Sequence, residues 1–79
     1  MSTKNNIYMK DSRIVQLALN IKAERIRKGL TQFELAEKIG ISESSMSLIE
    51  RAIQTPSVFV VFDISKVLKL DIKELFKDI

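Results

Sequence analysis

Seven of the polar side chains between Gln32 and Arg51 are the residues of this chain best suited to chemistry. They are Glu37, Lys38, Ser42, Glu43, Ser44, Ser45 and Ser47. Hydroxyl groups donate and accept hydrogen bonds and carboxylates accept them, so such a set can bind a polar ligand. The 79-residue chain has no histidine and no cysteine, which removes the usual general base and the commonest metal ligands. We therefore expect recognition by hydrogen bonding rather than catalysis, with no cofactor and no metal.

Small and apolar residues alternate with this polar set at the spacing of two short helices that cross steeply. Ala36 is small where the second helix must pass close. Gly40 lies at the turn, where a positive φ is easiest for glycine. The residues expected to point into the angle between the two helices are Leu35, Ile39, Ile41, Met46 and Ile49. This pattern is that of a helix-turn-helix, whose second helix usually enters the DNA major groove.

Capping residues place these two helices and one before them. The first helix is expected over residues 12–28, and Gly29 ends it. Thr31 and Glu34 form a capping box for the second helix, which runs to residue 39. Ser42 caps the third helix, which runs to about residue 51. The apolar residues of the first helix that form a partly helical stripe are Val15, Ala18, Leu19, Ile21 and Ile26.

Two further helices are predicted in the C-terminal part of the chain. Thr55 is the expected cap of the fourth helix, with Pro56 at its first position. Asp71 and Glu74 predict a capping box for a short fifth helix. The sequence thus predicts an all-α domain over residues 11–79 behind a flexible N-terminal arm of residues 1–10. Its predicted core is Ile21, Leu30, Leu35, Ala36, Ile39, Ile41, Met46, Ile49, Val61, Ile64, Leu68, Leu70, Leu75 and Phe76.

Composition excludes several classes of protein but does not by itself identify a partner. The net charge of +3 permits binding to a polyanion without demanding it. No apolar run approaches the roughly 20 residues that span a membrane, and the N-terminus has no signal-peptide core. The absence of cysteine fits a reducing compartment. We expect a cytoplasmic protein that binds neither a membrane nor a small-molecule ligand.

From Ile21 to Phe76 the sequence resembles the Cro/phage-repressor type of helix-turn-helix protein. The similar stretches are R-x-x-x-G-L-T-Q (residues 25–32), E-L-A-E-K-I-G-I-S (34–42), I-E-R (49–51), P-S (56–57) and V-L-K-L-D-I-K-E-L-F (67–76). The resemblance implies a five-helix, lambda-repressor-like domain that binds double-stranded operator DNA as a homodimer and regulates transcription. Restriction–modification controllers, phage repressors and some antitoxins have this layout, and the sequence does not separate them.

The resemblance also implies roles for individual residues. Gln32 lies where the family contacts a phosphate, and Glu43, Ser44 and Leu48 lie where it touches base edges. Arg51 lies near the loop that meets the DNA backbone. The full set expected to contact DNA is Thr31, Gln32, Ser42, Glu43, Ser44, Ser45, Ser47, Leu48, Arg51, Gln54 and Thr55.

Some of these positions also allow a purely structural role. Glu43 can accept a hydrogen bond from cytosine N4, but it repels phosphate and suits any helix N-terminus. Gln32 and Ser44 can be ordinary surface residues. Leu48 can pack on a thymine methyl group or be half-buried. Arg25 and Glu50 match a pair that forms an internal salt bridge in the family, which makes their role structural.

The sequence departs from the family pattern at two places. Ala52 stands where the family usually has glycine, so the third helix is expected to extend or to end without a left-handed residue. Phe59 and Val60 stand where the family usually faces water, whereas Val58 and Phe62 hold core-type positions.

Large apolar residues on an exposed face predict a protein interface, so Phe59 and Val60 are expected to contact the second subunit of a dimer. In one alternative, the first helix folds back and covers them. In another, the chain is a protein-interaction module such as an antitoxin or antirepressor. The weak positive charge, the acidic Glu43 and the apolar fourth helix favour the latter.

Overall fold

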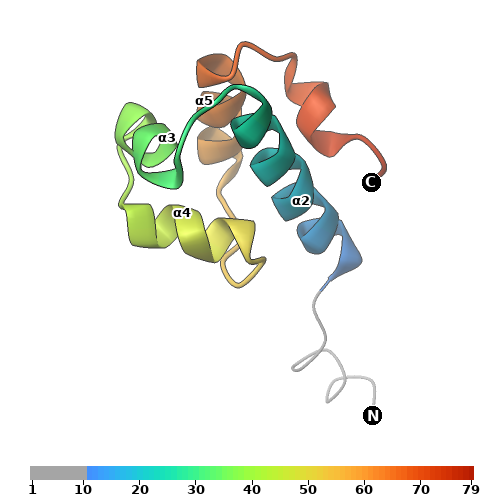
Figure 1. The fold of residues 1–79 in the computed structure, drawn as a ribbon. Coiled ribbons are helices and arrows are strands. Elements are labelled where there is room, and N and C mark those ends of the chain that lie inside the picture. The colour runs from blue at the N-terminus through green and yellow to red at the C-terminus, as the bar shows by residue number, and fades with distance from the viewer. Residues whose placement is uncertain (1–10) are drawn as a thin grey trace.

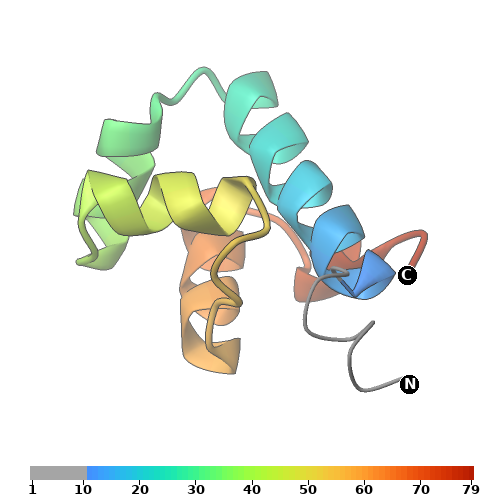
Figure 2. The same ribbon diagram turned by 90° about the horizontal axis from the view of Figure 1, so that it is seen from below.

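A computed structural model describes residues 11–79, so the predicted arm over residues 1–10 lies outside the described residues. Within the described range the fold is helical throughout, with no strand. Its elements are α2 (Ser12–Arg27), α3 (Gln32–Ile39), α4 (Glu43–Glu50), α5 (Val58–Val67) and the 3-10 helix η1 (Ile72–Phe76). Helix α4 lies across one end of the fold (Figure 1) and faces the viewer when the molecule is seen from below (Figure 2).

The first three described helices begin at the residues that the sequence predicts or next to them. The Asp11 carboxyl caps α2 by accepting from the Arg13 N–H at 2.9 Å, and hydrogen bonds from Arg13 lower the pKa of Asp11 to about 2. The capping box of α3 is complete, because the Glu34 N–H donates to Thr31 Oγ1 and the Thr31 N–H donates to Glu34 Oε1. Ser42 caps α4. Each cap satisfies N–H groups that a helix leaves without a partner.

The C-terminal helices differ from the prediction. Ser57, and not Thr55, caps α5 by accepting from the Val60 N–H at 3.1 Å, so Pro56 precedes the cap instead of opening the helix. The expected capping box at Asp71 is absent: the Asp71 carboxyl accepts from the Lys73 N–H, and its carbonyl accepts from the Glu74 N–H. This last bond spans three residues, the spacing of a 3-10 helix. Residues 11–79 therefore hold four α-helices, and a five-residue 3-10 helix replaces the predicted fifth.

One apolar cluster connects all five elements. Its buried members are Leu17, Ile21, Leu35, Ala36, Met46, Ile49, Val61, Ile64, Leu68 and Leu75. Apart from Leu17, the sequence predicts all of them. Four other predicted members pack against the cluster while only partly buried: Leu30, Ile39, Ile41 and Leu70.

Three apolar residues were expected inside and lie outside: Val58, Phe62 and Phe76. Leu19 and Ile26, of the predicted apolar stripe of the first helix, are exposed as well. On α5 the buried stripe is Val61, Ile64 and Leu68, at helical spacing. Phe62 is turned about 100° away from that stripe, and Val58 is the first residue of the helix. The prediction was wrong at these positions because one buried stripe already fills the inner face.

Ala52 takes the backbone conformation that the family usually gives to glycine. Its φ is 60°, and α4 ends just before it, at Glu50 with Arg51 as the C-cap. The sequence-based expectation for Ala52 was wrong, because the tertiary fold imposes a left-handed turn in spite of the Cβ atom. That conformation costs a residue with a side chain roughly 1–2 kcal/mol.

Ala52→Gly is therefore expected to raise the free energy of unfolding by about 0.5–1 kcal/mol, since the greater freedom of glycine in the unfolded chain offsets part of the relief. Urea denaturation measures the change. Gly40→Ala is the matched reverse substitution, because Gly40 has a φ of 78° and an added Cβ would meet no atom within 4 Å. It should destabilise by a similar amount. A less stable Ala52→Gly protein beside a less stable Gly40→Ala protein would contradict the strain at residue 52.

Candidate functional site

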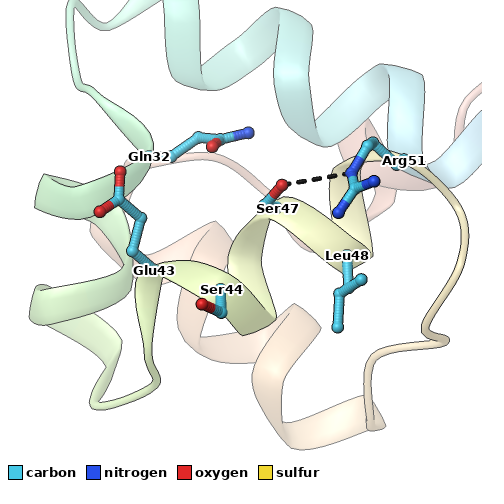
Figure 3. Close-up of a pocket in the computed structure, with 6 residues that line it drawn as sticks. All are labelled: Gln32, Glu43, Ser44, Ser47, Leu48 and Arg51. Atoms are coloured by element: carbon cyan, nitrogen blue, oxygen red, sulfur yellow. Dashed lines mark hydrogen bonds between the residues drawn. The ribbon is translucent and has the colours of Figure 1, made fainter.

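A hollow of about 380 Å³ lies along the outer face of α4. Figure 3 shows the six side chains that line it: Gln32, Glu43, Ser44, Ser47, Leu48 and Arg51. All of these except Gln32 come from α4 and its C-cap, at the spacing that puts residues on one face of a helix. Gln32 reaches the hollow from the start of α3. The sequence predicts all six as contact residues, and the fold brings them together.

An ion pair beneath the hollow holds α4 against α2. Arg25 Nε lies 2.7 Å from Glu50 Oε2, and Arg25 Nη2 donates to Glu50 Oε1 at 3.0 Å. The side chains of Arg25 and Glu50 are only 10% and 1% exposed. Arg25 Nη1 also donates to the Leu30 carbonyl at 2.7 Å. The predicted pair thus forms, and its two-pronged geometry fixes α2, the turn after it and the C-terminal end of α4 relative to one another.

The same network orients Gln32. Its Nε2 donates to Glu50 Oε1 at 3.0 Å, and because this nitrogen carries two hydrogens, one remains for a ligand. The sequence predicts a phosphate contact for Gln32 but not this bond with Glu50. The bond joins residues that are 18 positions apart, so no pattern within a single helix predicts it.

The charges in the hollow have opposite signs at its two ends. Glu43 begins α4 and lies toward α3, whereas Arg51 ends α4. Arg51 Nε donates to Ser47 Oγ at 3.2 Å, which orients the guanidinium beside the helix. Ser44 and Leu48 lie between the two ends and present a hydroxyl and an apolar group (Figure 3). The face therefore offers hydrogen-bond donors, acceptors and an apolar surface in one row.

The remaining predicted contact residues lie outside the hollow. Thr31 is occupied in the capping box of α3. Ser42 Oγ accepts from the Ser45 N–H, and the two hydroxyls lie 3.1 Å apart. Gln54 and Thr55 are exposed between α4 and α5. None of these five side chains lines the hollow, and Ser42 is the N-cap of α4, as the sequence predicts.

A second exposed surface, which we name the α5 face, consists of Ile53, Val58, Phe59 and Phe62. Their exposed fractions are 58%, 65%, 75% and 46%. The exposure of Phe59 shows that α2 does not cover it, so that alternative is wrong for this residue. Val60 is half-buried and packs against the core, because it lies beside the inward stripe. Of the two predicted interface residues, Phe59 alone is fully on the surface.

Residues 21–75 match the helix-turn-helix family HTH_3. The chain belongs to this family. Its helix-turn-helix consists of α3 and α4, and side chains of both helices line the hollow. The Cro/phage-repressor type of resemblance seen in the sequence is thereby confirmed.

Related helix-turn-helix proteins are regulators. The HTH-type transcriptional regulator SinR of Bacillus licheniformis is 41% identical over 59 residues, which are 73% of this chain and 53% of SinR. The chain thus spans about half the length of that relative. Among solved structures, the restriction–modification controller protein C.AhdI from Aeromonas hydrophila has a TM-score of 0.79 at 26% identity, over 84% of this chain and all of that one.

A third similar structure is that of SinR, the master regulator for biofilm formation, in complex with DNA. It has a TM-score of 0.70 and is 40% identical, over 75% of this chain and 95% of that one. Within residues 11–79 of our helix-turn-helix protein, no helix has the length and apolar character needed to cross a membrane. In the same residues, acidic side chains do not gather in a group that would hold a metal ion.

Proposed function

We propose that this helix-turn-helix protein is a sequence-specific transcriptional regulator that binds double-stranded operator DNA, with α4 as the recognition helix of its DNA-binding domain, residues 11–79. The observation that carries the proposal is the outer face of α4, where six hydrogen-bonding or apolar side chains line one hollow. The inner side of α4 is fixed to the rest of the fold and its outer side is polar, which suits a helix that enters the major groove. In that groove the base edges present donors, acceptors and thymine methyl groups. The complex of the relative SinR with DNA supports it.

The geometry suggests a division of roles along α4. Glu43 and Ser44 begin the helix and are proposed to meet base edges, with cytosine N4 as the partner of Glu43. Leu48 is proposed to pack on a thymine methyl group. Arg51, Ser47 and Gln32 are proposed to contact phosphates, which position the protein without specifying sequence. The contacts proposed outside the hollow are those of Thr31, Ser42, Ser45, Gln54 and Thr55.

A single copy of α4 covers only about half of an operator, so we further propose a homodimer. The α5 face is the surface best suited to hold it, because Val58, Phe59 and Phe62 expose apolar side chains near one another on one helix. Two recognition helices about 34 Å apart would match successive major grooves on one side of the duplex. Such a dimer predicts a palindromic operator.

In vitro selection of random duplex DNA by the purified protein, followed by sequencing, tests this function. We expect a palindromic site with half-sites about one helical turn apart. If the protein is folded and dimeric but enriches no sequence, the proposal is wrong. The exposed α5 face would then favour the second candidate, a protein-interaction module such as an antitoxin or antirepressor.

Arg51→Ala is expected to weaken binding about equally for all DNA sequences and to reduce the slope of log affinity against log salt by about 0.9, the value for one phosphate contact. Lys73→Ala is the control, because Lys73 is exposed on η1 and lies outside the hollow. It removes the same charge. Fluorescence anisotropy with a labelled duplex at several salt concentrations measures both. Equal slopes for the two variants would remove Arg51 from the interface.

A further inference from the structure

A second hollow, of about 570 Å³, lies where the C-terminal ends of α2, α3 and α5 come together. Its charged lining residues are Lys28, Lys38, Lys66 and Lys69. Its apolar lining residues are Leu30, Val67 and Leu68. We name it the lysine groove. In Figure 1 the C-terminal ends of α2 and α5 lie at the upper end of the fold, whereas α4 lies at the lower end.

The positive charge of the lysine groove is not neutralised by the rest of the described chain. No acidic residue lines the groove. The ion pairs formed within residues 11–79 involve Arg13, Arg25 and Arg27, and none of them includes a lysine. Lys66 lies over the Phe62 ring, with Nζ 5.2 Å from the ring centroid. Four ammonium groups thus surround one apolar hollow without a carboxylate partner.

Helix dipoles explain part of this arrangement. Cations are stabilised near the carbonyl ends of helices, and each lysine lies in or just after a last turn. The dipole does not account for Lys69, however. Its φ of 58° is a left-handed conformation that glycine would adopt with less strain. Nor does it account for the apolar floor, where Leu30 and Val67 stay half-exposed beside the buried Leu68.

We propose that the lysine groove docks an acidic segment of a partner protein, with carboxylates flanking one or two apolar side chains. The carboxylates pair with the lysines, and the apolar side chains cover Leu30 and Val67. A peptide fits this combination better than nucleic acid does, because a phosphate backbone offers nothing to an apolar floor. The groove lies at the end of the fold away from α4. The docking does not depend on the proposed DNA binding.

The test uses the whole chain and a fluorescent peptide in which two leucines are flanked by glutamates. Lys38→Glu with Lys69→Glu reverses two charges in the groove, while Lys22→Glu with Lys73→Glu reverses two exposed charges outside it. We expect the groove variant to bind at least about tenfold more weakly than the control variant, because like charges repel at the contact. Circular dichroism checks that both variants fold. Equal losses in the two variants would overturn the proposal.

A second measurement locates the peptide and tests the apolar floor. In ¹⁵N-labelled protein the amide signals of Leu30 and Val67 should shift on titration, and those of Ser44 and Leu48 should not. A matched peptide with serines in place of leucines should bind at least about fivefold more weakly, since it loses the apolar burial. Binding that ignores this exchange would overturn the proposal. So would a short DNA duplex that shifts the Val67 and Lys69 signals, because it would assign the groove to nucleic acid.

Discussion

Glu50→Ala is expected to lower the free energy of unfolding by about 3–5 kcal/mol, the loss typical of a buried ion pair that keeps only one partner. The Arg25 guanidinium would lose both of its bonds to Glu50 while remaining buried. Gln32 would lose its acceptor as well. Small domains have a total stability of roughly 5–15 kcal/mol. The variant should therefore be largely unfolded at elevated temperature, and its loss of DNA binding would follow from unfolding.

Two further variants separate the ion pair from other effects of the substitution. Arg13→Ala breaks the Arg13–Asp11 pair, whose side chains are 72% and 42% exposed. Loss of such a solvent-exposed pair should cost far less stability than loss of the buried one. Arg25→Met combined with Glu50→Leu leaves no buried charge and should lose less stability than Glu50→Ala alone. Urea denaturation of all three measures the differences. A double variant less stable than Glu50→Ala would show that the pair contributes more than charge compensation.

Phe59→Glu is expected to raise the dissociation constant of the proposed homodimer by about 10³-fold. Phe59 is 75% exposed, so the substitution leaves the core of the monomer unchanged. In the dimer it would place a carboxylate against an apolar surface, and loss of a well-buried anchor costs about 2 kcal/mol or more. Because a two-fold interface contains the residue twice, the expected cost is about 4 kcal/mol, which corresponds to this change in the constant.

Sedimentation equilibrium measures the change, and Phe33→Glu provides the matched control. Phe33 is 53% exposed on α3 and is not one of the residues of the α5 face. Phe33→Glu replaces the same residue type by the same charged residue and should leave the dimer intact. Val60 is not changed, because it is half-buried against the core and a charge there would disturb folding. A Phe59→Glu protein that remains dimeric would remove the α5 face from the interface. Operator affinity should fall together with dimerisation, since a monomer contacts one half-site.

The sequence was most informative where a structure depends on close neighbours. The capping box of Thr31 and Glu34 involves residues three positions apart, and the left-handed turn needs only Gly40. The helix limits of α2, α3 and α4 follow almost residue for residue. The sequence was less reliable where two local signals compete. Thr55 and Ser57 both flank Pro56, and only the path of the chain into the core decides that Ser57 caps α5.

The prediction of buried residues was likewise reliable for some helices and unreliable for another. Apolar residues at helical spacing predicted the buried apolar residues of α3 and α4. On α5 every residue from Val58 to Phe62 is apolar, so the periodicity does not mark an inner face. The tertiary contacts alone show that Val61 is buried while Phe59 and Phe62 are exposed.

By itself, the sequence determined an all-helical fold, the family, and a wider set of expected contact residues that includes those lining the hollow. These follow from caps, glycines and periodicities that act within one or two helical turns. The tertiary structure decided which polar residues share the hollow, that Gln32 is held by Glu50, and that Ala52 takes a left-handed turn. It also brought Lys28, Lys38, Lys66 and Lys69 to one groove. These features depend on how segments distant in the sequence pack against one another, and the patterns within a single helix do not determine that packing.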